Sequence, residues 1–168
     1  MILGGSLTLT ILITGFVMYF TYIRRKQLST MTGMVVCMAN SMLAGIVLGT
    51  VLGMTDHNRD LTLPTILAVS FGIIAGYLTG RPLSLVVSLE GMTAGMMGGM
   101  MGAMLGVMTQ PSTSQLMLFF LDVIYLFVCI VLIRVIEEET FKKSRLILWV
   151  TILIFIYILY ANLHIFLN

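Results

Sequence analysis

Long apolar runs, separated by short polar or helix-breaking segments, dominate the chain from one end to the other. A helix needs about 20 apolar residues to cross the hydrocarbon core of a bilayer, and the runs are of about that length. The pattern therefore predicts an all-α, polytopic membrane protein with six transmembrane helices in a single integral membrane domain, residues 1–168. The predicted spans are about 2–23, 30–54, 62–80, 83–108, 116–134 and 146–167.

The segments between these runs predict where the helices end. Gly80 followed by Pro82 favours a very tight helical hairpin, because glycine terminates helices and proline is tolerated in the first turn of the next one. The charged run 134–145 mixes glutamates with lysines and arginine, so we expect a short, solvated helical elbow there. All separators are short, and the chain therefore has almost no extramembrane domain.

Composition excludes most other classes of protein. The chain is 59% apolar and only 10% charged, whereas a water-soluble domain carries about 25% charged residues. The sequence has no basic patch large enough for nucleic-acid binding, and no nucleophile triad, P-loop, dinucleotide fingerprint or zinc protease motif. We therefore expect neither a nucleic-acid partner nor an enzyme. Cys37 and Cys129 both lie in apolar runs, which indicates no disulfide framework.

The distribution of lysine and arginine predicts the orientation of the chain. Basic residues collect on the cytoplasmic side of membrane proteins. When six spans are threaded with the N-terminus outside, Arg59 is the single outer residue among the 9 basic residues. We therefore expect an N-out, C-out topology in the bacterial cytoplasmic membrane, with the lipid bilayer as the principal partner.

Glycine recurs at every fourth position in three consecutive spans. Residues four apart share one helix face, and a face of glycines lets a neighbouring backbone approach closely, which is how helices associate in lipid. The spacing predicts glycine-zipper packing of the second, third and fourth spans, and a pore or an oligomer seam is the functional alternative. The glycines concerned are Gly45, Gly49 and Gly53, then Gly72, Gly76 and Gly80, then the interleaved rows Gly91, Gly95, Gly99 and Gly98, Gly102, Gly106.

Methionine is abundant in the chain and ordered along the fourth span. Four of the 15 methionines fall within a stripe about 60° wide when successive residues turn by about 100°. Glu90 falls on the same stripe, and the glycines occupy roughly the opposite side. The second span has a related layout that includes Met38 and Met42. The stripe of the fourth span consists of Met97, Met101, Met104 and Met108.

Two interpretations of the stripe stay open. Thioether sulfur is a soft, neutral ligand that favours Cu(I), and a column of weak sites along a helix suits the conduction of an ion. Alternatively, methionine is a flexible side chain that fills the gaps left by so many glycines. The alignment of the stripe with the Glu90 carboxylate favours binding or transport of a metal ion. Methionines that only fill gaps between helices need not align with a carboxylate. Met54 and His57 lie near the outer end of the second span. There they would either capture a soft metal ion or simply be hydrated.

These methionine and glycine motifs resemble those of the Ctr-type copper transporters, whose membrane helices carry methionines spaced MxxxM and glycines spaced GxxxG. The resemblance covers one helix of this chain. It implies Cu(I) as the ion and thioethers as its ligands. The matching residues are Met97–Met101, Met100–Met104–Met108 and Gly98–Gly102–Gly106.

Two acidic residues, Glu90 and Asp122, lie inside predicted spans. An ionisable side chain at that depth costs about 2.5 kcal/mol or more on insertion scales and is a functional candidate by default. Each could carry a proton or pair with a cation. Each could also serve as a structural hydrogen-bonding group, with Ser88 or Tyr125 as a partner nearby in sequence.

Together these patterns favour a membrane protein that binds or translocates a soft metal ion, Cu(I) first, along the methionine stripe. Two alternatives remain open. One is a non-transporting glycine-zipper assembly, either a homo-oligomer or a structural subunit of a membrane complex. The other is a small ion channel with Glu90 as its polar element.

The predicted topology can be tested by labelling single cysteines. A cysteine at position 58, Asn58→Cys, is expected to react with an impermeant maleimide added outside the cell, because it lies in the predicted outer loop. The variant Thr140→Cys is expected not to react, because it lies in the predicted cytoplasmic elbow. The opposite labelling pattern would overturn the N-out orientation.

Overall fold

The computed structural model describes residues 2–25, 28–55, 61–110 and 114–139, and they form helices joined by short turns. The all-α class is confirmed for these residues, and the first five predicted spans are helices. The sixth predicted span, 146–167, lies outside the described residues. The helices are α1 (Ile2–Arg24), α2 (Thr30–Thr55), α3 (Thr62–Gly80), α4 (Leu85–Met108) and α5 (Ser114–Glu139).

Four of these helices are long and apolar enough to cross a membrane, judged by length and composition. They are α2, α3, α4 and the part of α5 that ends at Ile136. The α5 helix continues without a break to Glu139, so the charged run begins inside this helix rather than after it. Charged side chains in the last turn of a helix are well placed to reach water. This explains why the helix extends beyond the end of the apolar run.

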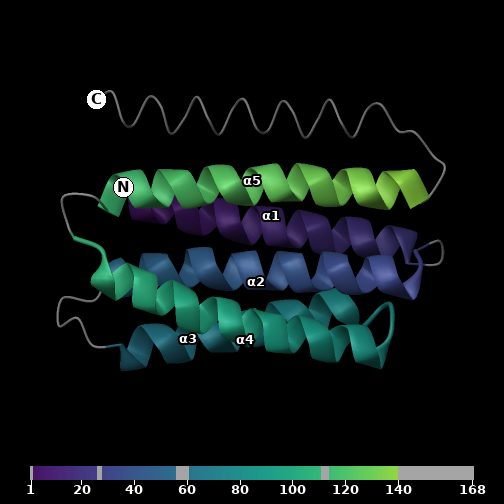
Figure 1. Ribbon diagram of the computed structural model, residues 1–168, viewed down its shortest axis with the longest axis horizontal. Helices are drawn as coiled ribbons and strands as arrows, with labels where there is room; N and C mark the ends of the chain where they lie inside the picture. Colours follow the sequence, from purple (N-terminus) through teal and green to yellow (C-terminus); the bar gives the residue numbers. More distant parts are fainter. Residues whose placement is uncertain (1, 26–27, 56–60, 111–113, 140–168) are drawn as a thin grey trace.

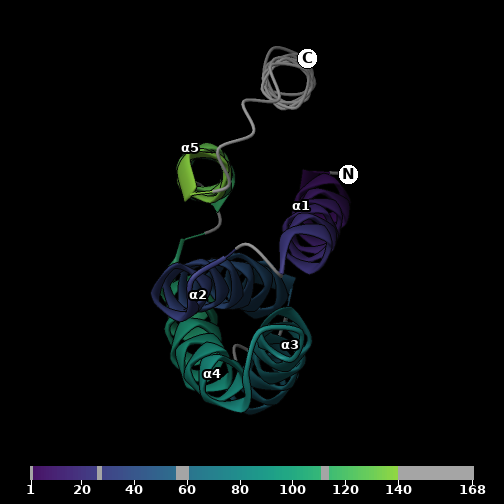
Figure 2. The ribbon, with the colours of Figure 1, turned by 90° about the vertical axis from the view of Figure 1, so that its right-hand side faces the viewer.

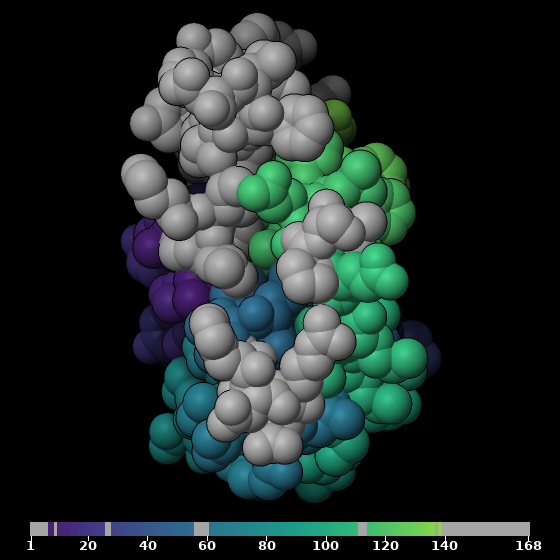
Figure 3. Space-filling view, turned by 90° about the vertical axis from the view of Figure 1, so that its left-hand side faces the viewer, coloured from purple at the N-terminus to yellow at the C-terminus, as the bar shows by residue number. Residues whose placement is uncertain are grey.

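The α2 helix lies at the centre of the arrangement and packs against each of the other four described helices. Figure 1 and the end-on view of Figure 2 show α3 and α4 on one side of α2, and α1 and α5 on the other. The space-filling view from the opposite end shows α1 in purple and α5 in green on opposite flanks of the upper part (Figure 3). The most extensive contacts are those of α4 with α2 and with α3.

The contacts of α4 with α2 and α3 are made by backbone against backbone. A Cβ atom added to Gly45 would lie 2.8 Å from the backbone nitrogen of Gly99, and one added to Gly53 would lie 2.8 Å from the carbonyl oxygen of Ala103. The two glycine rows of α4 face different neighbours. A Cβ atom added to Gly98, Gly102 or Gly106 would meet α2, and one added to Gly95 or Gly99 would meet α3, although the backbone of this second row also contacts α2 at Gly45.

The other side of α2 packs in a different way, through large side chains. Val17 and Phe20 of α1, Val36 and Val47 of α2, and Ile133 of α5 are buried there in one apolar cluster. Branched and aromatic side chains keep these helix backbones further apart than glycine does. The structure thus has a glycine-packed half and a side-chain-packed half that share α2.

The turn between α3 and α4 is as tight as the sequence predicts, but proline does not begin the second helix. The carbonyl oxygen of Gly80 accepts hydrogen bonds from the backbone nitrogens of Leu83 at 2.9 Å and Ser84 at 3.2 Å. The Ser84 side chain caps α4, because its hydroxyl accepts a hydrogen bond from the Val87 nitrogen at 3.2 Å. The expected start at residue 83 is therefore two residues early, and Pro82 lies within the turn.

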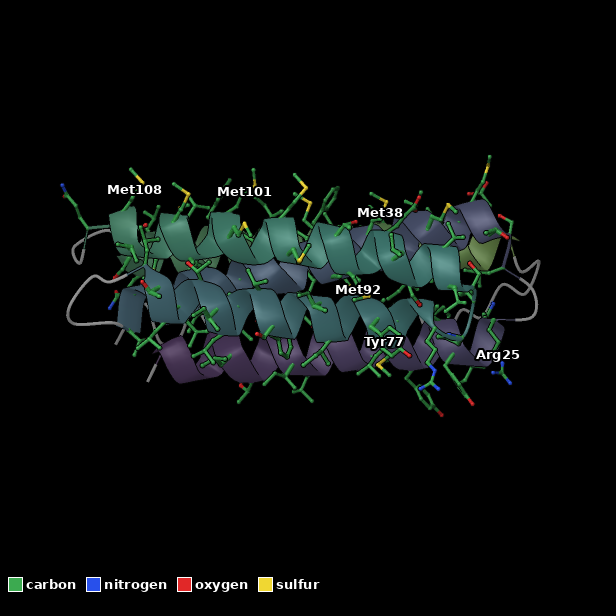
Figure 4. The ribbon with its side chains drawn as sticks, turned by 90° about the horizontal axis from the view of Figure 1, so that it is seen from below. Arg25, Met38, Tyr77, Met92, Met101 and Met108 are labelled. Atoms are coloured by element: carbon green, nitrogen blue, oxygen red, sulfur yellow. The ribbon has the colours of Figure 1, made fainter. Side chains whose placement is uncertain are left out.

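Three basic side chains lie over aromatic rings near helix ends. The guanidinium of Arg24 is 4.9 Å from the ring centre of Phe20, that of Arg25 is 4.9 Å from Tyr22, and that of Arg81 is 5.7 Å from Tyr77. Arg25 and Tyr77 lie toward the same end of the bundle in Figure 4. Aromatic and basic residues at one level are typical of a membrane–water interface.

A pair of glycine substitutions tests the close backbone contact. In Gly49→Ala the new methyl group would lie 2.7 Å from the Ala103 nitrogen and 2.8 Å from the Gly99 oxygen. Overpacking of this kind lowers stability by about 1–3 kcal/mol, so we expect a lower melting temperature in detergent. The matched control is Gly15→Ala, because no atom from the other described helices lies within 4 Å of a Cβ at that position. The control should be neutral or stabilising by up to about 1 kcal/mol, since alanine favours helix over glycine. Equal melting temperatures for the two variants would refute the contact.

Candidate functional site

The α4 helix has an inner face of small residues and an outer face of methionines. All of its described glycines from Gly91 to Gly106 are buried, as are Ala94 and Ala103. The four stripe methionines are exposed, from 50% for Met101 to 77% for Met108. The predicted opposition of glycines and methionines on this helix is confirmed. We call Met97, Met101, Met104 and Met108 the methionine face.

The orientation of this face follows from the glycine contacts. Because two glycine rows must lie against α2 and α3, the remaining arc of α4 is turned away from both neighbours. Figure 4 shows Met101 and Met108 on the outer side of the bundle, with Met38 of α2 on the same side. Met92, on another face of α4, is half-buried and lies toward α3 in the same view.

The other predicted metal ligands lie in different surroundings. Met38 is 42% exposed, whereas Met42 and Met54 are half-buried. The carbonyl oxygen of Met42 contacts Gly98 at the α2–α4 interface, so its backbone has a packing role. His57 lies outside the described residues.

Glu90 is half-buried on α4, seven positions before Met97. Its carbonyl oxygen accepts a hydrogen bond from the Thr93 hydroxyl at 2.9 Å. Within the part of the chain that the structure describes, no three His, Cys, Asp or Glu side chains gather in a way that could hold a metal ion. A metal site on this side of α4 would therefore depend on thioethers, with at most one carboxylate.

Asp122 lies far from the methionine face. It belongs to α5 and is only 2% exposed, on the side-chain-packed half of the structure. The two intramembrane acids predicted from the sequence are thus separated by α2. On the same half of the structure, Thr14, Asn40 and Tyr125 form a hydrogen-bonded group. Sequence reasoning missed this group as a unit, although a single asparagine within an apolar run was a signal for it.

Two polar side chains of α2 reinforce the glycine contacts. The Ser41 hydroxyl lies 2.8 Å from the carbonyl oxygen of Gly91 and 2.7 Å from that of Cys37, its two closest acceptors. The Cys37 thiol donates to the carbonyl oxygen of Gly76 at 3.3 Å. Cys37 is fully buried between α2, α3 and α4, so its sulfur is a packing group and is not open to a ligand. Cys129 is buried in the apolar cluster.

Comparisons with protein-family models, with curated proteins and with solved structures found no match to this chain.

The burial of the two cysteines predicts their reactivity. Neither Cys37 nor Cys129 should react with a maleimide in the folded protein, and both should react after denaturation in sodium dodecyl sulfate. The variant Met108→Cys is the matched control, because that position is 77% exposed at the end of α4. It should add one thiol that reacts without denaturation, counted by mass spectrometry. Labelling of Cys37 in the folded protein would contradict the packing described here.

Proposed function

We propose that the protein is a multi-span membrane protein whose methionine face binds a soft metal ion, with Cu(I) as the first candidate. The observation that carries this proposal is the exposure of the four methionines, each at least half exposed. A methionine that fills a gap between helices is buried by its neighbours. These four fill no gap between the described helices, so gap filling does not account for a thioether at each of these positions.

The spacing along α4 suits two-sulfur sites. Met97 and Met101 are four residues apart, as are Met104 and Met108, and a rise of about 1.5 Å per residue separates the members of each pair by about 6 Å along the axis. Methionine has three rotatable bonds beyond Cα, so two such sulfurs can turn toward one ion. Soft thioether ligands select Cu(I) over hard cations. The resemblance to Ctr-type copper transporters agrees with this ligand chemistry.

The outward position of the face favours binding at the surface of the bundle over conduction through one copy of it. The inner side of α4 is closed by backbone contacts with α2 and α3. Two sulfurs leave room for further ligands on the ion, and a second copy of the chain that presents the same face would supply them. The proposal therefore includes a homo-oligomer in which methionine faces meet, and any translocation would follow that seam.

The membrane architecture that we propose is a bundle of six spans, N-out and C-out, held by glycine zippers in the bacterial cytoplasmic membrane. It is supported by four described helices long enough to cross a bilayer and by the backbone contacts at Gly45, Gly49 and Gly53. It is also supported by the confinement of all basic residues except Arg59 to one side in this threading.

A non-transporting assembly is the second candidate function. It is favoured by the extent of the glycine contacts, which join α2, α3 and α4 through their backbones. In that case the methionine face would contact lipid or another membrane subunit as ordinary apolar surface.

Replacing sulfur by carbon separates the two candidates. In the double variant Met97→Leu/Met101→Leu the side chains keep about the same volume, so the fold should be retained. Copper bound after anaerobic Cu(I) loading, measured by elemental analysis of the purified protein, should fall to half or less. The matched control Met92→Leu lies on another face of α4 and should bind as much copper as the parent protein. A double variant that binds as much copper as the parent, or a parent that binds none, would leave the non-transporting assembly as the function.

A further inference from the structure

Three arginines lie at one end of the bundle, each with its guanidinium over an aromatic ring. Arg24 ends α1 and Arg25 follows it, whereas Arg81 follows the end of α3. The rings beneath them are those of Phe20, Tyr22 and Tyr77, respectively. We call Arg24, Arg25 and Arg81 the arginine cluster. None of these residues belongs to the methionine face, and the packing between the helices does not use their charge.

A contact between distant segments brings the two helix ends together. A Cβ atom added to Gly33, in the first turn of α2, would lie 2.8 Å from the Leu83 side chain. Leu83 lies just after Arg81 in the turn between α3 and α4, and α2 begins at Thr30, shortly after α1 ends at Arg24. The α1 and α3 helices also contact each other, and the end-on view of Figure 2 shows them on the same flank of α2. The arginines of α1 and α3 therefore lie at the same end of neighbouring helices.

The surroundings of the arginine cluster are poor in negative charge. The helices α1, α2 and α3 contain no aspartate or glutamate. The acidic run 137–139 ends α5, which lies on the other flank of α2 in Figure 2. The Nη1 atom of Arg24 is fully buried and has no hydrogen-bond partner among the described residues. A buried charged donor without an acceptor is costly, so an anion that accepts a hydrogen bond from this nitrogen would stabilise the structure.

The chemistry of the guanidinium group favours a phosphate as this anion. The N–H groups of arginine lie in the plane of the guanidinium, so a group that lies over a ring still has N–H donors at its edge. Phosphate oxygens accept such donors in pairs, and the hydrogen bonds are strengthened by the opposite charges. Basic pockets between membrane helices bind the headgroups of anionic lipids in this way.

The position of the arginine cluster favours a lipid over a free phosphate ion. Aromatic and basic residues at one level are typical of a membrane–water interface, where lipid headgroups lie. Apolar side chains are exposed in the last two turns of both helices, namely Ile23 of α1 with Ile74 and Leu78 of α3. Acyl chains would contact these side chains while the headgroup contacts the arginines, whereas a free phosphate ion would gain the charged contacts alone. A zwitterionic headgroup carries a cation of its own, which the positive charge of the cluster disfavours.

We propose that the arginine cluster binds the phosphate of an anionic phospholipid, whose acyl chains lie along the exposed apolar side chains of α1 and α3. Arg24 and Arg81 hold the headgroup from two helices, and Arg25 adds positive charge beside it. The bound lipid thereby links the ends of α1 and α3. This site requires that the helices span a bilayer, but it does not require that the methionine face bind a metal ion.

Lipid titration of the full chain in detergent, followed by native mass spectrometry, tests this site. The parent protein should bind phosphatidylglycerol more tightly than phosphatidylcholine. Arg24→Gln and Arg81→Gln should each lower the affinity for phosphatidylglycerol by about fivefold or more, the typical contribution of one arginine near an anionic surface. The matched control Arg134→Gln removes the same charge from an exposed position of α5 and should retain the affinity of the parent. Inorganic phosphate should displace no more lipid than sodium chloride at the same ionic strength.

Four outcomes would overturn the proposal. Equal affinities of the parent for the two lipids would show that the headgroup charge is not recognised. An equal loss of affinity in Arg134→Gln would show a general attraction to surface charge in place of a site. Specific displacement by inorganic phosphate would identify a site for a free anion. Unchanged affinity in both Arg24→Gln and Arg81→Gln would remove the cluster from lipid binding. If Arg24→Gln does not fold, Arg81→Gln decides alone, because Arg81 is exposed.

Discussion

The close approach of the α4 backbone to α2 and α3 is the constraint on which the rest of the structure depends. A side chain at Gly45 or Gly49 would place its Cβ less than 3.0 Å from backbone atoms of α4, a separation that real Cβ atoms do not reach. The contact therefore requires glycine on both helices, and it also fixes how α4 is rotated. Once two arcs of α4 are committed to α2 and α3, most of the large side chains in the glycine-rich part of that helix occupy the third arc. The methionine face is exposed for this reason, whatever it binds.

The two halves of the structure differ in what they can do. A backbone-to-backbone contact contains few side chains that could change rotamer, so the interfaces between α2, α3 and α4 resist internal rearrangement. The opposite half is packed by side chains such as Val17, Phe20 and Ile133, and these contacts tolerate small changes of rotamer. This half also contains the side-chain hydrogen bonds of Thr14, Tyr125 and Asn40, which join α1, α5 and α2.

Much of the fold follows from local sequence pattern, and the parts that do not are set by contacts between distant residues. Apolar runs locate the ends of the five described helices to within five residues, and four-residue spacing places glycines and methionines on opposite sides of α4. The pattern does not reveal that one glycine row faces α2 and the other α3, because periodicity within one helix carries no information about its neighbours. The link from Tyr125 to Thr14 spans 111 positions and the link to Asn40 spans 85. The start of α4 depends on the capping hydroxyl of Ser84. The pattern of apolar residues contains no signal for this cap.

If the methionine face binds a metal ion as proposed, its outward position would couple metal binding to association. A pair of thioethers four residues apart supplies two ligands from one helix, and a surface ion gains further ligands when a second copy presents the same face. Metal would then bind the assembled form more tightly than the single chain. By linkage, any ligand that prefers one state shifts the equilibrium toward it, so Cu(I) would promote assembly to the same extent that assembly strengthens Cu(I) binding. A face that contacts only lipid would show no such coupling between Cu(I) and assembly. On such a face leucine could replace methionine without effect. A metal site and an apolar surface therefore differ in whether Cu(I) shifts the equilibrium between the single chain and its assembly.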